Sequence, residues 1–417
     1  DVTHYVHPGD MIDAEGQSRA TSVYLVDRTV PMLPERLSNG LCSLRPNEEK
    51  LCFSAIFELS PEAEVQQEWF GRTVIYSDRR FTYQEAQDVI ETGRGDLFDE
   101  ILLLNDLAQK LRAERFRNGS INFERDEAKF ELDENGKPLR VYFKEIKESN
   151  QLIEEFMLLA NRKVAEFVGR KRKGVQNSDR TFVYRIHDKP NTDKMAQFRS
   201  FVTRFGYQMK AQGNKAVAKE INRLMKKIHG RKEENIISTL AIRSMAKATY
   251  STDNIGHYGL AFDYYTHFTS PIRRYPDLQI HRIIKENLRG RLTGERMEHY
   301  RKILTEVASQ CSQRERTAEE SEREVVKLKK AEYMQAHIGE EYEGVISGVT
   351  KWGVYVELPN TIEGLIHVAD MRDDHYNFIE ETYEMVGEHT GKTWKLGQKV
   401  QVRVTDADRL QRTVNFE

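Results

Sequence analysis

Cysteine is scarce in this 417-residue chain, which contains only Cys42, Cys52 and Cys311 and no CxxC pair. These three residues give no disulfide framework, and such usage fits a reducing compartment, so we expect a cytoplasmic protein. Long apolar runs are also lacking, which argues against a membrane span, and no signal-peptide pattern opens the chain.

An excess of one charge is missing as well. The chain has 64 Lys and Arg residues against 66 Asp and Glu residues, a net charge of −2. Any binding of nucleic acid must therefore come from local basic patches. The hydrophobic share of 39% is enough for real cores, and the length suggests two or three domains. Because the first residue is not methionine, we expect a fragment of a longer protein.

The residue patterns predict a mixture of helices and strands over most of the chain. Residues 1–80 alternate short apolar segments with turn residues, which favours strands and loops. Two alternating runs around "DENGK" predict a hairpin within residues 121–143, because Asn-Gly is a strong turn signal. Helical spacing of apolar residues predicts helices from residue 97, around residues 152–160, over most of 192–249, and from about 294 to 336.

The pattern changes at Ile338. From there to residue 417 apolar and polar residues alternate, with glycines where a small barrel must bend. We therefore expect a separate five-stranded barrel of the OB type over residues 338–417, with "VQVRVTDADRLQRTVNFE" as its last two strands.

The stretch "HFTSPIRRYPDLQIHR", residues 267–282, is the strongest candidate site. Ser270 and Pro271 predict a turn that runs into a helix start, where free backbone N–H groups favour an anion. Arg273 and Arg274 follow at once, and a guanidinium can grip two phosphate oxygens. The alternative for such a pair is a set of surface salt bridges, but this position favours anion binding.

Other candidates stand out less on residue type alone. His257, His267 and His281 have no metal-ligand spacing and are interpreted as hydrogen-bonded polar residues. Glu154 and Glu155 lie in the first turns of a helix, and we expect Glu155 to complement the helix dipole and be solvated. The remaining candidates are aromatic residues that normally pack in cores, a glutamate on a charged helix face, and residues of the barrel that could stack on bases or add charge, namely Tyr24, Phe123, Glu322, Trp352, Tyr355, His367, Lys351 and Arg403.

Taken together, these motifs resemble the ribonuclease R / ribonuclease II family of 3′→5′ exoribonucleases. The matching segments are "PMLPERLSNGLCSL" (31–44), "EEFMLLAN" (154–161) and "NIGHYGLAFDYYTHFTSPIRRYPDLQIHR" (254–282), and the last of these is closer to the ribonuclease R branch. The C-terminal barrel is similar to the RNA-binding module that is repeated in ribosomal protein S-one. The resemblance implies an α+β fold with an RNB-type catalytic domain over residues 1–337, in which helices surround a mixed sheet and form an RNA channel, followed by the OB-fold barrel.

The resemblance also implies roles for individual residues. Tyr24 and Phe123 match positions that clamp the terminal bases, and Glu154 matches a carboxylate beside the 3′-terminal nucleotide. Arg273 matches the arginine that holds the phosphate near the scissile bond. Glu322 matches a position near the channel floor. We expect these residues to contact single-stranded RNA, together with Arg274 and the barrel residues Trp352, Tyr355 and His367. Single-stranded RNA is the expected partner. We expect the protein to be a monomer that works in RNA decay or with ribosome-associated proteins.

One departure from the family pattern concerns its magnesium site. The family holds magnesium with four aspartates in a D-x5-D-x-D-D arrangement, which does not occur in the 417 residues. We therefore expect the chain by itself to lack the metal ligands and to be inactive, while the longer protein hydrolyses RNA. The rivals are a non-catalytic RNA-binding relative and a scaffold in an RNA-decay assembly.

Overall fold

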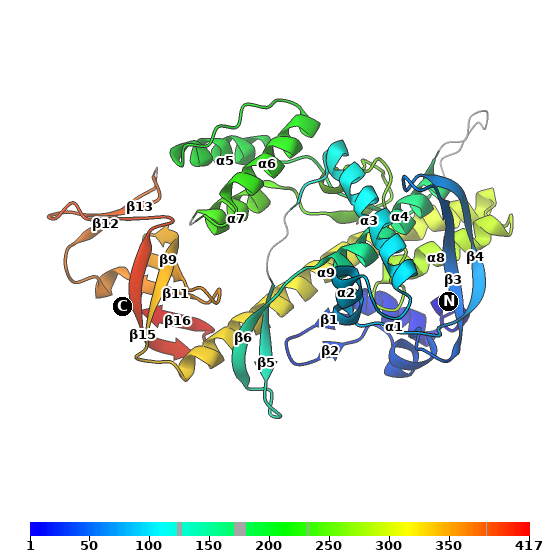
Figure 1. The fold of residues 1–417 in the computed structure, drawn as a ribbon, viewed down its shortest axis with the longest axis horizontal. Helices are drawn as coiled ribbons and strands as arrows, with labels where there is room; N and C mark the ends of the chain where they lie inside the picture. Colours follow the sequence, from blue (N-terminus) through cyan, green and yellow to red (C-terminus); the bar gives the residue numbers. More distant parts are fainter. Residues whose placement is uncertain (123–126, 171–180, 232, 381) are drawn as a thin grey trace.

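The structure, a computed structural model, describes residues 1–122, 127–170, 181–231, 233–380 and 382–417. The chain forms a larger part of mixed helices and hairpins and a smaller barrel, and its two termini lie toward opposite ends of the long axis (Figure 1). No helix in these ranges is long and apolar enough to cross a membrane.

The larger part contains nine α-helices in its described residues, two short 3-10 turns, one π-helical turn and four pairs of strands. In chain order the elements are η1 (Val2–His4), α1 (Met11–Arg19), β1 (Val23–Tyr24), β2 (Thr29–Val30), η2 (Arg36–Leu41), β3 (Glu49–Leu59), β4 (Val65–Tyr76), α2 (Tyr83–Thr92), α3 (Phe98–Asn118), β5 (Glu127–Leu132), β6 (Pro138–Lys144), α4 (Glu148–Gly169), β7 (Tyr184–Ile186), α5 (Thr192–Arg204), α6 (Asn214–Ile228), α7 (Glu234–Ser244), β8 (Thr249–Ser251), η3 (Tyr258–Leu260), α8 (Tyr275–Leu288) and α9 (Gly294–Gln335).

The α+β class expected from the sequence is confirmed, with two differences in detail. Where a mixed sheet was expected, the described strands of this part pair only in antiparallel twos: β1 with β2, β3 with β4, β5 with β6 and β7 with β8. Helix α1 lies in a region predicted to hold only strands and loops. Its sequence has no apolar stripe, so periodicity could not reveal it, but Asp10 caps it by accepting a hydrogen bond from the Asp13 amide at 2.6 Å.

Helix α8 lies in the main hydrophobic core. Leu278, Ile280, Ile283 and Ile284 are fully buried, on all sides of the helix, and they pack with residues of η1, β3, β4, α4 and α9. Its polar residues Asp277, Gln279, His281 and Arg282 are buried as well, so the helix is covered on every face. The segment that enters α8 is therefore anchored to the main hydrophobic core.

Helix α9 connects the two parts. It crosses the molecule and ends beside the barrel, with the β5–β6 hairpin along its course (Figure 1). The Lys330 Nζ donates to the Thr361 carbonyl, and Arg409 and Arg412 form ion pairs with Glu332 and Glu324 of the helix at 3.5 and 3.0 Å. These contacts fix the barrel to the last turns of α9.

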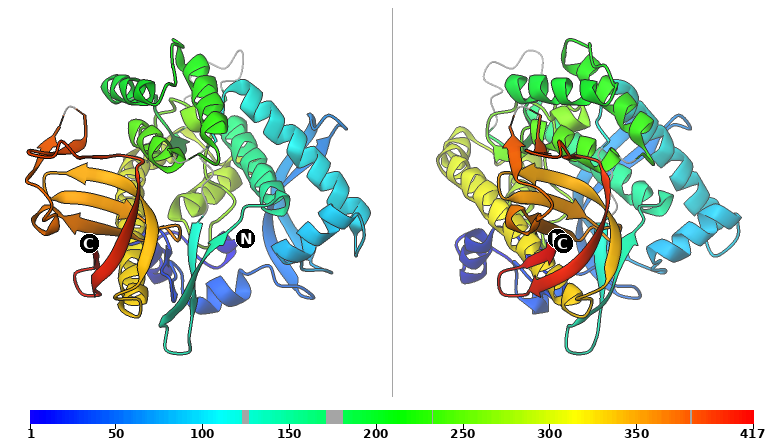
Figure 2. Two further views of the ribbon diagram at one scale, coloured as in Figure 1. Left: turned by 60° about the vertical axis from the view of Figure 1, so that its left-hand side comes forward. Right: turned by 90° about the vertical axis from the view of Figure 1, so that its left-hand side faces the viewer.

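The barrel closes in the strand order β10-β11-β16-β15-β9, which confirms the predicted five-stranded OB-type fold. An additional three-stranded sheet, β12-β13-β14, is inserted before β15 and was not predicted from the sequence. In Figure 2 the barrel stands beside α9, with the helices α5 to α7 above it. The elements are β9 (Glu341–Thr350), β10 (Gly353–Glu357), β11 (Glu363–His367), η4 (Val368–Asp370), β12 (Tyr376–Ile379), β13 (Glu384–Gly387), β14 (Thr393–Lys395), β15 (Lys399–Asp408) and β16 (Thr413–Phe416).

Candidate nucleic-acid interface

The loop of residues 266–274, here called the arginine loop, leads into α8. The helix begins at Tyr275, with Pro276 in its first turn, and so starts later than the Ser270–Pro271 turn predicted from the sequence. Asp277, which is fully buried in that first turn, accepts hydrogen bonds from the Ser270 amide at 2.7 Å and from Arg274 at 2.8 Å. One carboxylate therefore ties both ends of the Ser-Pro turn to the helix start.

Two other segments fix the backbone of the arginine loop. The buried Asn161 side chain of α4 accepts hydrogen bonds from the amides of Phe268 and Thr269 at 2.8 and 3.2 Å. The Arg273 carbonyl accepts from the Ser22 amide at 3.0 Å, just before β1. Because these partners come from distant parts of the chain, the loop conformation depends on the whole core.

The two arginines of the loop have different surroundings. Arg274 is held inside the protein, since its side chain is only 13% exposed and is paired with Asp277. Arg273 is partly exposed, and its guanidinium makes no hydrogen bond or ion pair with the described residues. The geometry therefore leaves Arg273 available for an external anion and gives Arg274 first of all an internal partner.

Tyr24 and Glu322 lie together although they are 298 residues apart. The Glu322 Oε1 accepts a hydrogen bond from the Tyr24 amide at 2.8 Å, so the β1–β2 hairpin is held against α9. The Tyr24 side chain is 48% exposed and is not packed in the core. An exposed aromatic ring beside a fixed backbone is suited to stacking on a base.

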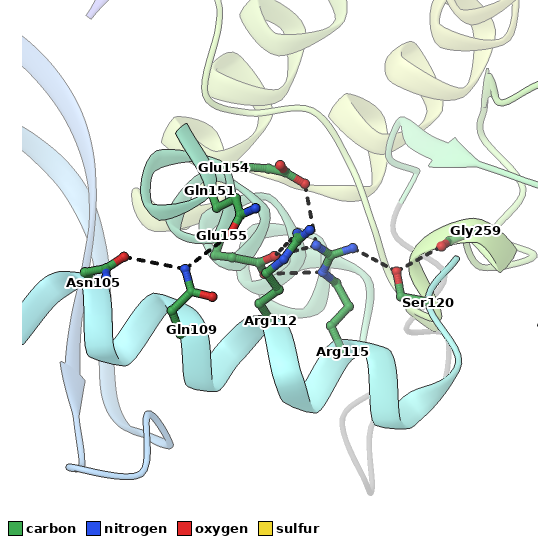
Figure 3. Close-up of polar contacts among 9 residues, drawn as sticks. All are labelled: Asn105, Gln109, Arg112, Arg115, Ser120, Gln151, Glu154, Glu155 and Gly259. Atoms are coloured by element: carbon green, nitrogen blue, oxygen red, sulfur yellow. Dashed lines mark hydrogen bonds and ion pairs between the residues drawn. The ribbon is translucent and has the colours of Figure 1, made fainter. Parts of the chain in front are cut away.

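Glu154 and Glu155 point to different surroundings (Figure 3). Glu155 was predicted to be a solvated residue at a helix start, and this is wrong, because α4 begins at Glu148 and Glu155 is only 3% exposed. It pairs with Arg112 and Arg115 of α3. Glu154 is 46% exposed and lies 3.5 Å from Arg115. The two helices are thus joined by a buried ionic contact, with one carboxylate at its edge.

The three histidines make hydrogen bonds, as predicted. His267 Nδ1 lies 2.8 Å from the Tyr250 hydroxyl, His281 Nε2 lies 2.8 Å from the Phe268 carbonyl, and His257 accepts from the Leu260 amide at 3.2 Å. Burial lowers the pKa of His257 to about 3 and of His281 to about 4, and it holds the pKa of His267 well below its ordinary value. Near neutral pH these rings are uncharged and do not attract phosphate; His267 and His281 support the arginine loop, and His257 supports the turn up to Leu260.

Phe123 lies outside the described residues. The residues directly before it are anchored: the Ile121 amide donates to the Gly259 carbonyl at 2.8 Å, and the Asn122 amide donates to the Asn222 side chain of α6 at 2.9 Å. The described chain is therefore held at Ile121 and Asn122 by α6 and by the loop of residues 254–262.

Three of the barrel candidates, Lys351, Trp352 and His367, lie near one end of β10 and β11. Trp352 is 58% exposed, with the Lys351 Nζ 4.9 Å from its ring centroid. Tyr355 is half-buried, and the exposed His367 caps η4 by accepting from the Ala369 amide at 3.2 Å. Arg403 lies on β15, where it pairs with Glu341 and Glu417. Trp352 is thus an open stacking surface, while Arg403 already has two acidic partners.

A large cleft of about 2490 Å³ separates the barrel from the helices of the larger part. Its walls carry twelve Lys and Arg residues and five Glu residues, an excess of positive charge in a chain whose net charge is −2. Tyr355 lines the cleft, whereas Arg273, Tyr24 and Glu154 do not. A concave, positively charged surface of this kind attracts a polyanion.

Models of protein families match both parts of the chain: the RNB domain matches residues 1–290 and the S1 RNA binding domain matches residues 335–417. The chain belongs to the RNB domain family. Its sequence is 41% identical to "Ribonuclease R 1" of Lactococcus lactis and 37% identical to "Ribonuclease R" of Thermotoga maritima, in each case over 100% of this chain. It covers 51% and 59% of those proteins, so the chain spans little more than half the length of the curated relatives it matches.

A solved structure of an RNB-family protein has the same fold. It is the structure of Mycoplasma genitalium RNase R in complex with ribose methylated single-stranded RNA, with a TM-score of 0.91 and 26% identity. The match covers 100% of this chain and 65% of that one. The RNB assignment therefore holds for sequence and fold alike.

RNB-family ribonucleases are hydrolytic nucleases, which generally use a divalent metal ion. The described residues of this RNB chain contain no group of three or more His, Cys, Asp or Glu side chains placed to hold a metal. The described residues by themselves therefore do not fit a two-metal centre.

Sequence reasoning missed several residues of this RNB chain that shape the site. Asn161, Asp277, Arg112 and Arg115 are buried polar residues, and nothing in a single sequence distinguishes them from solvated ones. The basic face of α6 could have been found, because Lys219, Arg223 and Lys226 recur at helical spacing and all line the cleft.

Proposed function

We propose that this chain is the RNA-gripping part of a 3′→5′ exoribonuclease that hydrolyses single-stranded RNA to nucleoside 5′-monophosphates. The arginine loop carries the proposal: buried partners fix its backbone, and Arg273 remains partly exposed without a partner among the described residues. A guanidinium held in this way can bind phosphate oxygens with little rearrangement. Membership of the RNB family and the relatives named ribonuclease R support the same activity.

The path of the RNA follows from charge and exposure. The basic cleft draws the single strand between the barrel and the helices, where Tyr355 contacts it, and Trp352 and His367 contact bases or backbone outside the cleft lining. Tyr24 and Phe123 clamp the terminal bases, with Glu322 holding the Tyr24 backbone. Glu154 lies beside the terminal nucleotide. Arg274 pairs with Asp277 and so helps to hold the backbone that carries Arg273.

Further features of the whole protein belong to the same proposal. We infer that its metal is magnesium and that the described residues of this chain act on the RNA rather than on the metal. We place the domain boundary between residues 337 and 338, since α9 ends at Gln335 and β9 begins at Glu341. The protein would act as a monomer in the cytoplasm, with partners from RNA decay or from ribosome-associated assemblies.

The test measures binding and hydrolysis with the 417-residue chain. We expect it to bind a single-stranded RNA more tightly than a blunt duplex of the same length, because stacking on exposed aromatic rings requires unpaired bases. We expect no release of mononucleotides in magnesium, because the described residues lack a carboxylate cluster. Equal affinity for both RNAs would contradict the proposed grip, and mononucleotide release would show that other carboxylates of the chain hold the metal.

A non-catalytic RNA-binding protein is the second candidate, favoured by the same lack of a ligand cluster. It predicts identical binding but no hydrolysis by any longer protein that contains this chain. Mononucleotide release by that longer protein in magnesium decides between the two. A scaffold role predicts instead that protein partners stay bound after nuclease treatment.

A further inference from the structure

Two buried guanidiniums, those of Arg112 and Arg115, lie in the contact between α3 and α4, and that of Arg115 also reaches Ser120 and Glu154 (Figure 3). Arg115 is 6% exposed, and it donates to both carboxylate oxygens of Glu155. It also donates to the Ser120 hydroxyl at 2.8 Å and lies 3.5 Å from the Glu154 carboxylate. Because the guanidinium is planar and most of its N–H groups are engaged, its orientation is fixed.

The first consequence concerns Glu154. It lies seven residues before Asn161 on α4 and therefore on the same face of the helix, about 10 Å away along the axis. Asn161 holds the arginine loop, so Glu154 lies on the face of α4 that bears this loop. The half-exposed Glu154 carboxylate has the fixed Arg115 beside it, while Glu155 on the neighbouring face is buried.

The second consequence concerns the segment that leads to Phe123. The Ser120 hydroxyl, which accepts from Arg115, donates to the Gly259 carbonyl at 3.0 Å. The Asn222 side chain donates to the Ser120 carbonyl at 2.6 Å. One guanidinium thus connects the end of α3, the loop around Gly259 and the carboxylate of Glu154.

We propose that Arg115 is a positioning residue for the 3′ end of the RNA, and that through Glu154 it makes the site prefer a 3′-hydroxyl end over a 3′-phosphate end. This inference rests on the proposed function. A carboxylate accepts a hydrogen bond from a ribose hydroxyl and repels a phosphate, but only when it is held toward that group. Arg115 supplies a holding contact, and its hydrogen bond to the anchored Ser120 helps to fix the guanidinium.

The experiment compares two otherwise identical single-stranded RNAs, one ending in a 3′-hydroxyl and one in a 3′-phosphate. Binding to the 417-residue chain is measured by fluorescence anisotropy with a label at the 5′ end. We expect the unaltered chain to prefer the hydroxyl end by about tenfold, the size of a like-charge contact in a largely aqueous site. Glu154→Gln should remove most of this preference.

The substitution Arg115→Met distinguishes positioning from charge alone. If Arg115 positions Glu154, the ratio of the affinities for the hydroxyl end and the phosphate end falls toward one. If Arg115 acts only as a nearby positive charge, its loss weakens binding of the phosphate end, and the preference grows. Arg115→Lys should keep only part of the preference, because a point charge cannot reproduce the planar contact. Lys110→Met, which removes an exposed lysine paired with Asp106 on the same helix, should leave it unchanged.

Folding is checked by thermal unfolding of each variant, because Arg115→Met leaves Glu155 buried beside one fewer partner. The double variant Arg115→Met with Glu155→Gln removes that buried negative charge, which Arg112 alone would otherwise have to balance, and decides the question if the single variant does not fold. An unchanged or increased preference in the folded variant overturns the positioning role. Failure of the unaltered chain to bind either RNA contradicts the proposed function instead.

Discussion

The arginine loop and the exposed face of the barrel, both of which we propose to contact RNA, are built in opposite ways. In the loop a partly exposed arginine stands on a backbone fixed by buried side chains from α4 and α8, with Asp277 fully buried and Asn161 only 3% exposed. On the barrel, Trp352 and Lys351 project from a turn between β9 and β10, and neither side chain makes a hydrogen bond or ion pair with the described residues.

This difference distinguishes two ways of binding RNA: through a charged group that is fixed in advance, and through several exposed side chains. A group fixed before the substrate arrives pays no reorganisation at the moment of reaction, so its effect is concentrated in one residue and in the residues that hold it. Exposed aromatic and basic residues act additively on a flexible strand, and each contributes little. Substitutions should therefore be severe under the loop and mild on the barrel.

The largest effect is expected for the support of the loop. Asp277→Ala leaves Arg274 buried without its partner and frees the Ser270 amide, and removing one member of a buried ion pair lowers the free energy of unfolding by about 3–5 kcal/mol. Urea unfolding measures the loss. Asp253→Ala, at an exposed position, is the matched control and should change the stability by no more than about 0.5 kcal/mol. Equal small losses for both variants would show that the loop does not depend on Asp277.

The role of Asp277 illustrates what the sequence could not reveal. The composition of "SPIRRYPD" indicated a turn, an anion site and a following helix, and all three expectations used only local rules. Which arginine is free depends on whether the Asp277 carboxylate is buried, and burial is set by β3, β4, α4 and α9, which are remote in the chain. The turn and the following helix were thus predictable and the anion site stays a prediction, whereas the different surroundings of Arg273 and Arg274 could not be predicted.

The same limit explains Glu155, α1 and the inserted sheet of the barrel. Glu155 sits on an apolar face of α4 because two arginines of α3 neutralise it, and that pairing joins residues 40 or more positions apart. Helix α1 is held by its cap and by tertiary contacts rather than by an apolar stripe. By contrast, α9 and the last two barrel strands follow long, regular patterns and lie within a few residues of their predicted bounds.

The next largest effect is expected for Arg273 itself. It is measured on a longer protein that contains this chain and hydrolyses RNA. If its guanidinium meets the phosphate as charge develops, Arg273→Ala should lower the single-turnover rate about a hundredfold, while RNA affinity, shared among many contacts, changes little. Arg273→Lys should restore only part of the rate. Arg291→Ala, exposed beyond the other end of α8, is the control. A large loss of affinity with an intact rate per bound complex would make Arg273 a binding residue only.

The smallest effect is expected on the barrel. There, substitutions of Trp352 and Lys351 should have different effects, because one residue would stack on a base and the other would contact a phosphate. Trp352 is 58% exposed, so Trp352→Ala should leave the stability unchanged and remove one stacking contact, lowering the affinity for single-stranded RNA about tenfold. Because the ring carries no charge, the slope of log K against log salt should stay the same. Lys351→Ala is the matched variant: if Lys351 contacts a phosphate, that slope falls by about 0.7 with only a modest loss of affinity. Anisotropy titrations at several salt concentrations measure both quantities. If neither the affinity nor the slope changes, this end of the barrel does not contact the RNA, and the cleft wall around Tyr355 becomes the surface to test.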